Sequence, residues 1–323
     1  MKAMAQRSWN PAEKLELVEL PTPEPKKGEV RAQVQAIGVN PVDWKMRTSG
    51  PLRLAARLLG PKPPVVVGVD FAGVVEVVGP GMTRTAPGER VVGGTNFSRG
   101  QRGSYADTVV VREDQLCVVP DAVDIAVAAA LPVSGVTAQL AVVDLGGIRR
   151  VQPGQRRVLV LGASGGVGQL AVQIAKLEGA FVAGVCSTKN VETVKGLGAD
   201  LVLDYNEGDV LAQAKPHAPF HVVVDCVGSY SGAGCRGLLS PRGRHIMVAG
   251  DEPSAVVQML MPPFKSKTIL GRPTGARLEP LVAAAAAGKL HVAIAQKLPL
   301  TRAEEAHELS RTSRMTGKLI LEP

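Results

Sequence analysis

The chain has 323 residues, of which 45% are hydrophobic and only 3% aromatic, and its formal net charge is +8. A chain of this length can bury a large core of Val, Leu, Ala and Ile, and it predicts two domains rather than one. The basic residues are spread along the sequence without a dense Lys/Arg run. This distribution argues against a nucleic-acid-binding surface and favours an ordinary solvated surface with some focusing of an anionic cofactor.

The four cysteines are Cys117, Cys186, Cys226 and Cys235, and no two of them form a Cys-x-x-Cys pair. Their spacing gives no disulfide framework and favours a reducing compartment. The N-terminus lacks an apolar signal core, and no segment approaches the ~20 apolar residues that a membrane span needs. We therefore expect a cytoplasmic protein without an integral membrane segment.

The first third of the chain predicts short strands separated by turns. Strand-like runs lie at residues 30–36, 65–78, 90–92 and 105–111. Such runs favour a compact, mostly-β domain with a barrel-like or partly open sheet. From Val123 the character changes, and residues 124–145 are Ala- and Val-rich with helical spacing.

The stretch from Val158 to Gly168 predicts a strand, a tight turn and a helix. An apolar run ends at Leu161, and glycines follow at positions 162, 165 and 168. Glycines at this spacing let the backbone approach a bound group, and the helix N-terminus presents free N–H groups and the positive end of its dipole. In this strand-to-helix context we predict pyrophosphate binding, as in dinucleotide sites. No Lys-Ser or Lys-Thr follows the glycines, so an ATPase-type phosphate loop is excluded.

Beyond the glycine turn, apolar strands and helix-compatible segments alternate regularly. The strands are predicted at residues 181–186, 201–203, 221–224 and 245–249. This alternation predicts a βαβ series and therefore a doubly wound parallel sheet. The tail predicts helices over 278–287 and 301–311, and a final strand over 317–321 that returns to the first domain. Thr301 and Glu304 have the spacing of a capping box.

Motifs along nearly the whole chain resemble those of the zinc-independent quinone oxidoreductase branch of the medium-chain dehydrogenases/reductases. They are Gly38-Val-Asn-Pro-Val-Asp-Trp-Lys45, Gly68-Val-Asp-Phe-Ala-Gly73, Pro87-Gly-Glu-Arg-Val91, Gly103-Ser-Tyr-Ala106, Leu131-Pro-Val-Ser-Gly-Val-Thr137, the glycine turn, Cys186-Ser-Thr-Lys-Asn190, Leu197-Gly-Ala-Asp200, Asp204-Tyr205 and Gly317-Lys-Leu319. Within the branch, the first motif and the Gly-Lys-Leu-Ile-Leu-Glu-Pro ending resemble the plant chloroplast-envelope quinone oxidoreductases and alkenal/enone reductases, and their bacterial relatives.

The resemblance implies an α/β protein with an active site in the cleft between two domains. A GroES-like, mostly-β catalytic domain would span residues 1–122, and a doubly wound parallel (Rossmann) NADPH-binding domain residues 123–274. The C-terminal segment, residues 275–323, would complete the catalytic domain. A homodimer is also implied, formed through the edge segment Lys267–Arg272.

No catalytic metal is expected. The resemblance places the zinc ligands of related alcohol dehydrogenases near Asn40 and at Val69 and Asp70, and their four-cysteine lobe at the cysteine-free loop 93–104. Zinc needs soft or borderline ligands that converge at short distance. None of these positions supplies Cys or His, so we predict chemistry without a metal.

The cofactor is predicted from the second strand of the βαβ series, which ends Val185-Cys-Ser-Thr-Lys189 without a carboxylate. An NAD site usually has an acidic side chain here, whereas hydroxyls and a cation favour a 2′-phosphate. The resemblance implies that Ser187, Lys189 and Tyr205 contact this phosphate, so NADPH is preferred over NADH. The alternative is that Lys189 is a surface lysine at a helix start. The remaining implied cofactor residues are Thr137, Gly162, Ser164, Gly165, Gly166, Val167, Gly168, Cys226, Gly228, Ala249 and Gly250.

Hydride transfer to a quinone, or to the β-carbon of an enone, places negative charge on a carbonyl oxygen, and preorganised donors there lower the barrier. The resemblance implies that Asn40 is such a donor, with Lys45 or an ordered water as the proton source and Asp43 orienting the motif. Alternatively, Asn40 is a turn residue before Pro41, and Lys45 is simply solvated.

The sequence therefore predicts an NADPH-dependent reductase of quinones or of the activated C=C bond of α,β-unsaturated carbonyls. One alternative is an enoyl-thioester reductase, although the tyrosine proton donor usual in those relatives is missing from Met46 to Val69. The other alternative is an NADPH-binding sensor or structural protein with little turnover.

Overall fold

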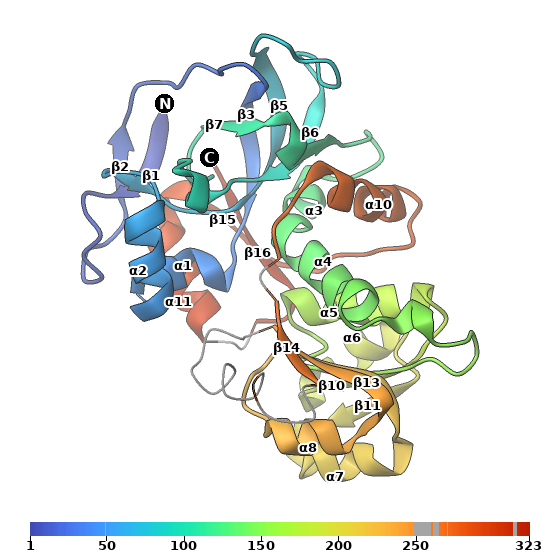
Figure 1. Ribbon diagram of the computed structural model, residues 1–323. Helices are drawn as coiled ribbons and strands as arrows, with labels where there is room; N and C mark the ends of the chain where they lie inside the picture. The colour runs from blue at the N-terminus through green and yellow to red at the C-terminus, as the bar shows by residue number, and fades with distance from the viewer. Residues whose placement is uncertain (49, 249–259, 261–264, 270, 313–314) are drawn as a thin grey trace. The chain divides into compact units, whose positions relative to one another are not determined.

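A computed structural model of the protein describes residues 1–48, 50–248, 260, 265–269, 271–312 and 315–323 (Figure 1). The chain folds into two compact units. Unit 1 comprises Met1–Val136, Arg272–Gly288 and Val292–Pro323, and unit 2 comprises Thr137–Gly271 and Lys289–His291. The tail thus returns to the N-terminal unit. Among the described residues, no helix has the length and apolar character needed to cross a bilayer.

Unit 1 is built on a seven-stranded sheet in the order β15-β16-β3-β5-β6-β8, with β7 paired to β3. Its strands are β3 (Glu29–Gly38), β5 (Asp70–Val78), β6 (Arg90–Gly94), β7 (Thr108–Arg112), β8 (Leu116–Val118), β15 (Ile294–Pro299) and β16 (Lys318–Glu322). A smaller sheet joins β2 (Glu16–Glu19), β1 (Lys2–Gln6) and β4 (Val65–Val66). The predicted alternation in β3 is confirmed, because Val30, Ala32 and Val34 are buried in one core.

Two predicted strands of unit 1 are shorter than expected, for one shared reason. The run 65–78 breaks at Gly68, whose φ of +98° is outside the range of a strand. A β-carbon at Gly68 would also collide with the ring of Tyr105. Residues 103–105 donate backbone hydrogen bonds to the carbonyls of residues 66–68, so β7 begins only at Thr108. This close contact places the Tyr105 ring inside unit 1, where it is fully buried.

Six of the described α-helices are not part of the βαβ series of unit 2. They are α1 (Pro41–Thr48), α2 (Gly50–Leu59), α3 (Ile125–Ala129), α4 (Pro132–Gln139), α10 (Gly275–Ala286) and α11 (Ala303–Arg311).

The predicted capping box at Thr301 is wrong. Thr301 lies in a 3₁₀ turn, and α11 has Arg302 as its N-cap without a side-chain cap bond. Glu304 instead accepts hydrogen bonds from the buried Arg47 and from the Leu15 N–H. A charge-assisted bond to a buried guanidinium outweighs a cap.

Unit 2 contains a six-stranded parallel sheet in the order β11-β10-β9-β12-β13-β14. Its strands are β9 (Arg157–Leu161), β10 (Phe181–Cys186), β11 (Leu201–Asp204), β12 (Phe220–Asp225), β13 (Leu239–Met247) and β14 (Ser266–Thr268). Helices α5 (Gly166–Leu177) and α6 (Val191–Gly196) cover one face, and α7 (Val210–Ala214) and α8 (Gly232–Gly237) the other (Figure 1). The predicted doubly wound sheet is confirmed.

The strand order of unit 2 determines where a ligand can bind. The chain leaves β9 in one direction toward β11 and in the other direction toward β14, so the order reverses between β9 and β12. In open parallel sheets, ligands bind beyond the carboxyl ends of the strands at this switch point. Strand β13 begins earlier than predicted, and Ala249 and Gly250 lie outside the described residues. The predicted dimer segment 267–272 begins within β14, which lies at the edge of the sheet, and the homodimer stays a prediction.

Candidate active-site residues

The glycine turn of unit 2 joins β9 to α5 at the switch point. Gly162 has a φ of +80°, and a β-carbon at Gly168 would collide with the Gly162 carbonyl, so close packing of helix on turn requires both glycines. Gly165 is the N-cap of α5 without a side-chain cap bond, and a β-carbon there would meet only the Gly162 oxygen, at 3.5 Å. The start of α5 is therefore open to an anionic group, which fits the predicted pyrophosphate site.

The predicted 2′-phosphate residues lie after two neighbouring strands, because Cys186 of β10 pairs with Asp204 of β11. Lys189 and Tyr205 are exposed, and Ser187 is buried. Asn190 was not among the predicted site residues, and its amide donates to Ser164 Oγ at 3.1 Å and to Ser187 Oγ at 3.2 Å. Asn190 thus ties the glycine turn to the end of β10. Only its place directly after Lys189 could have indicated this role.

A carboxylate does lie near this region, on the third strand of the series. Asp204 closes β11, and its Oδ1 accepts the Asn206 N–H at 2.9 Å, whereas its Oδ2 has no hydrogen-bond partner among the described residues. The neighbouring Thr188 and Asn206 lower the pKa of Asp204. Only one of the two carboxylate oxygens is therefore engaged by a donor of the described residues. At the end of β10 itself the described side chains are hydroxyl, amide and amine groups.

The remaining described cofactor residues are Thr137, Cys226 and Gly228. Thr137 is buried on α4, and Cys226 follows β12 directly. The loop after β12 is held by Asp225, whose Oδ1 accepts the N–H groups of Val227 at 2.9 Å and of Gly228 at 2.8 Å. Thr137, Cys226 and Gly228 remain predicted cofactor contacts.

The predicted catalytic residues lie in unit 1, where Asn40 links β3 to α1. Its Nδ2 donates to Asp70 Oδ2 at 2.9 Å and to the Gly38 carbonyl at 3.2 Å, while its Oδ1 accepts from Lys318 Nζ at 2.6 Å. Asn40 is buried, and both amide hydrogens are used within the protein. Donation from Asn40 to a substrate oxygen therefore requires one of these bonds to open.

Asp43 and Asp70 are two fully buried carboxyl groups beside Asn40. Burial, and then the charge of Asp70, raise the pKa of Asp43 to about 7, although the bond from the Asn40 N–H opposes the rise. Burial raises the pKa of Asp70 to about 6, although the Lys318 ammonium, at 3.7 Å, opposes this. Two carboxyls in one buried site resist simultaneous ionisation, which leaves a proton near Asp43 at neutral pH.

A chain of hydrogen bonds extends from Asp43 to α11, and its direction follows from Arg47. The guanidinium of Arg47 can only donate, so His307 Nδ1, at 2.8 Å, is the acceptor. The proton of the neutral imidazole is then on Nε2, which donates to the Tyr105 hydroxyl at 3.0 Å. Tyr105 in turn donates to Asp43 Oδ2 at 3.3 Å. Burial and the neighbouring Arg47 lower the pKa of His307 to about 3, consistent with this neutral form.

In unit 1, Lys318 is the main functional residue that was not predicted. This fully buried lysine begins β16 and also donates to the Val39 carbonyl at 3.0 Å. Burial lowers its pKa, and Asp70 and Asp43 oppose that change. Its signal in the sequence was a single cation at the start of an otherwise apolar strand. The predicted Lys45, by contrast, is half-buried on α1, with its Nζ 5.6 Å from the centre of the Trp44 ring.

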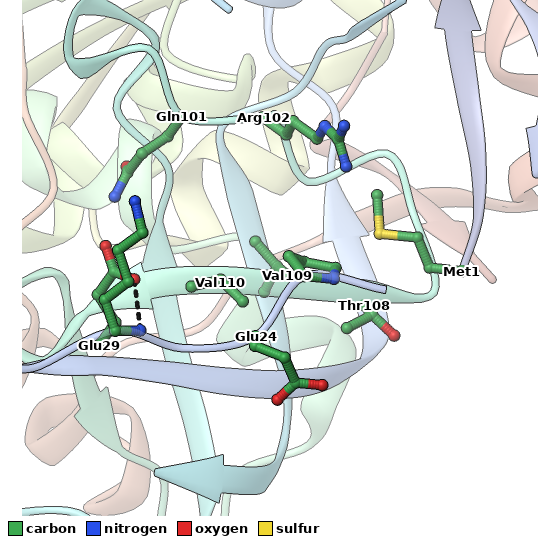
Figure 2. A pocket seen from close by; sticks show the side chains of 11 residues that line it. Met1, Glu24, Glu29, Gln101, Arg102, Thr108, Val109 and Val110 are labelled. Atoms are coloured by element: carbon green, nitrogen blue, oxygen red, sulfur yellow. Dashed lines mark hydrogen bonds between the residues drawn. The ribbon is translucent and has the colours of Figure 1, made fainter. Parts of the chain in front are cut away.

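A surface hollow of about 350 Å³ lies elsewhere in unit 1, beside β7. Figure 2 shows Gln101 and Arg102 on one side of it and Glu24 on the other. None of the predicted site residues lines this hollow. It therefore does not form part of the candidate site.

Two family models match the chain: the alcohol dehydrogenase GroES-like domain over residues 26–121, and the zinc-binding dehydrogenase over residues 197–321. The chloroplast envelope quinone oxidoreductase homolog of Arabidopsis thaliana is 36% identical over 315 residues, which cover 96% of this chain and 94% of that protein. The mitochondrial NAD(P)H oxidoreductase RTN4IP1 of Bos taurus is 35% identical over 210 residues, covering 62% of this chain and 52% of that protein.

Among solved structures, the quinone oxidoreductase from Coxiella burnetii superposes with a TM-score of 0.88 at 29% identity, covering 100% of this chain and 99% of that chain. The similarity therefore extends over both units. Combined with the doubly wound sheet and its glycine turn, it makes this protein an oxidoreductase with a nicotinamide cofactor. The chain belongs to the quinone oxidoreductase branch of the medium-chain dehydrogenase/reductase superfamily.

Proposed function

We propose that the protein is an NADPH-dependent reductase that transfers a hydride to quinones or to the activated C=C bond of α,β-unsaturated carbonyls. The observation that carries this proposal is the polar, cationic end of β10, with Ser187 and Lys189, beside the uncapped start of α5. NADPH, when bound, supplies the hydride from its nicotinamide ring. The names of the plant and bacterial relatives support the choice of acceptor.

The preference for NADPH rests on charge. The adenosine 2′-phosphate that distinguishes NADPH from NADH is stabilised by a cation and by hydroxyl donors. Lys189 and Tyr205 are exposed at the ends of neighbouring strands, where they can reach such a phosphate. Asn190 holds Ser187 and Ser164 in place.

In unit 1, the buried residues around Asn40 are proposed to manage the proton that the reduced substrate takes up. Reduction of a quinone or enone creates an anionic oxygen that must be protonated or stabilised. Asp43, with a pKa of about 7, holds a proton that is exchangeable at neutral pH. Tyr105, His307 and Arg47 fix the position of that carboxyl. Asn40 and Lys318 are then positioning residues for Asp70 and Asp43, and Lys45 remains the predicted alternative proton source.

The experiment that tests the proposal is the oxidation of NADPH, followed by absorbance, against a panel of acceptors. The panel contains a phenanthrenequinone, benzoquinone, an alkyl vinyl ketone, hexenal and crotonyl-CoA, with NADH run in parallel. We expect turnover with the quinones or the enones, and faster turnover with NADPH than with NADH. Activity with crotonyl-CoA far above all others would instead establish the enoyl-thioester reductase. Tight binding of NADPH without turnover on any acceptor would favour the sensor.

The proposed compartment is the cytoplasm, because all four cysteines are free thiols, three of them buried. Free thiols are usual where the environment is reducing. The plant relatives carry chloroplast names, which refer to a different compartment. Fractionation of the source cells with an antibody to the protein tests this part of the proposal, and recovery in a membrane or organelle fraction would contradict it.

A further inference from the structure

Unit 2 holds a second group of polar side chains that the proposed reaction does not use. Asp225 ends β12, Cys235 lies on α8 and His245 lies on β13. A carboxylate oxygen, the thiol sulfur and an imidazole nitrogen of these residues all lie within 4.8 Å of one another. The three side chains are at most 2% exposed. Three potential metal ligands from three elements therefore converge inside the protein.

Within the described part of the chain, one ring nitrogen of His245 lacks a hydrogen-bond partner. Its Nε2 is buried and has no hydrogen-bond partner among the described residues. The facing Asp225 Oδ2 is 3.7 Å away, which is too long for a hydrogen bond. A buried nitrogen without a partner costs free energy. The nitrogen and the carboxylate oxygen thus face each other across a gap that a bound ion would bridge.

The other polar atoms of the two side chains are held in the way that metal ligands usually are. His245 Nδ1 is 3.1 Å from Ser266 Oγ, so an N–H on that nitrogen would leave Nε2 with a free lone pair. Asp225 Oδ1 accepts two backbone N–H groups, from Val227 and Gly228, and these bonds orient Oδ2 toward the cluster. Both potential ligands therefore have supporting partners outside the cluster.

We propose that Asp225, Cys235 and His245 form a structural site for a divalent transition metal, with Zn²⁺ as the preferred ion. Thiolate, imidazole and carboxylate together are a ligand set that suits Zn²⁺, and Co²⁺ is its usual spectroscopic substitute. Binding replaces the thiol proton, which is released to solvent, and the charge of the ion then balances one thiolate and one carboxylate. Three protein ligands leave a fourth position for water.

The proposed ion would link β12, α8 and β13 and would stiffen the loop 226–228 that Asp225 holds. This site is separate from the residues around Asn40, and it does not depend on the proposed reductase function.

The test measures metal content and spectrum, since the buried site would load as the chain folds. The full chain is expressed with added zinc, or refolded with Co²⁺, then desalted and analysed by elemental mass spectrometry and absorbance. We expect about one ion per chain and a thiolate-to-Co²⁺ charge-transfer band. The variant Cys235→Ser should lose the band, and His245→Gln should lose most of the metal. The control Cys186→Ser removes another buried thiol of unit 2 and should behave as the wild type.

Two results would overturn the site. The first is a wild-type protein that folds with Co²⁺ and shows no thiolate band or binds far less than one ion per chain. The second is a Cys235→Ser variant that keeps the metal and the spectrum of the wild type. Because the first result needs only the wild-type chain, the proposal remains testable even where a variant does not fold. Zinc should also raise the thermal unfolding temperature of the wild type and not that of Cys235→Ser.

Discussion

His307 Nε2 lies 3.0 Å from the Tyr105 hydroxyl, and the guanidinium of Arg47 on the other imidazole nitrogen fixes which of the two groups donates. The pair joins α11 to the interior of unit 1, and both side chains are fully buried. A histidine in this arrangement must stay neutral, because protonation of Nδ1 would place two hydrogen-bond donors face to face. The folded state therefore lowers the pKa of His307, and the free energy of unfolding depends on pH through this group.

We predict that His307 makes the protein less stable as the pH falls from about 6.5 toward 3. Its pKa is about 3 in the folded state, below the ordinary value of 6.5, so the unfolded chain binds more protons in this range. The free energy of unfolding should then fall by up to ~1.4 kcal/mol per pH unit through this group. Urea unfolding at pH 7 and pH 5 measures the fall in the wild type and in His307→Gln.

The comparison between the two proteins isolates the histidine from the other titrating groups. His307→Gln should be destabilised at pH 7, but its stability should decline less on acidification than that of the wild type. The control His291→Gln changes an exposed histidine of unit 2 and should keep the wild-type slope. A His307→Gln protein with the full wild-type slope would refute the neutral, buried imidazole.

Asp43 should have the opposite effect on stability. Its pKa is raised to about 7 in the folded state, so between pH 4 and 7 the folded protein binds more protons than the unfolded chain. The contribution of Asp43 to stability is therefore greatest at low pH and declines as the pH rises toward 7. In Asp43→Asn this contribution is absent. We expect the variant, relative to the wild type, to be more destabilised at pH 5 than at pH 8 in the same urea experiment.

The same carboxyl should appear in the kinetics if it holds the proposed proton. The pH profile of kcat should show an inflection near 7 in the wild type, and Asp43→Asn should lower kcat and remove that inflection. Asp121→Asn, which changes a fully exposed carboxylate of unit 1, serves as the control. If Asp43→Asn keeps the wild-type pH profile of kcat, the inflection belongs to another group.

Lys318 and Asp70 provide a fourth prediction, which concerns stability alone. The ammonium lies 3.7 Å from the carboxylate, and both side chains are at most 4% exposed. Removing one partner of a buried pair leaves an uncompensated charge and costs roughly 3–5 kcal/mol. We expect this loss of unfolding free energy in Lys318→Met. The double variant Lys318→Met/Asp70→Asn should recover part of it, and an additive loss in the double variant would show that the two groups are not coupled.

The parallel sheet could be predicted because its signal is local. Residues 158–161 are apolar on both faces and the glycines follow at once, so strand, turn and helix are evident from one short stretch. The network of unit 1 could not be predicted in this way. Lys318 meets Asn40 across 278 positions of sequence, and His307 meets Tyr105 across 202. A lysine in an apolar strand indicates burial, but only the pairing of β16 with β3 shows which groups compensate its charge.

The capping box at Thr301 shows that a tertiary contact can override a local sequence pattern. Its local pattern was correct, since a threonine stands three positions before a glutamate. The glutamate is nevertheless taken by Arg47, a residue 257 positions away. Local patterns therefore predict elements well where no buried charge competes for their polar groups. Where such a charge exists, the tertiary partner determines where the helix begins.

Lys189 gives the last prediction, because it distinguishes the phosphate contact from an ordinary surface lysine. A charge-assisted hydrogen bond to a phosphate is worth roughly 1.5–3 kcal/mol, which corresponds to about a 10- to 150-fold change in affinity. Lys189→Ala should therefore raise the KM for NADPH by about that factor and leave the KM for NADH nearly unchanged, since NADH lacks the 2′-phosphate. The control Lys215→Ala removes an exposed lysine elsewhere in unit 2 and should affect the KM of neither cofactor.

Equal changes in the KM for NADPH and NADH in Lys189→Ala would indicate a general effect on the fold or on the electrostatic field of unit 2. If Lys189→Ala changes the KM of neither cofactor, Lys189 does not contact the 2′-phosphate, and only Ser187 and Tyr205 remain as candidates. The triple variant Lys189→Ala/Ser187→Ala/Tyr205→Phe then tests them. A triple variant that still prefers NADPH over NADH would refute the proposed 2′-phosphate site.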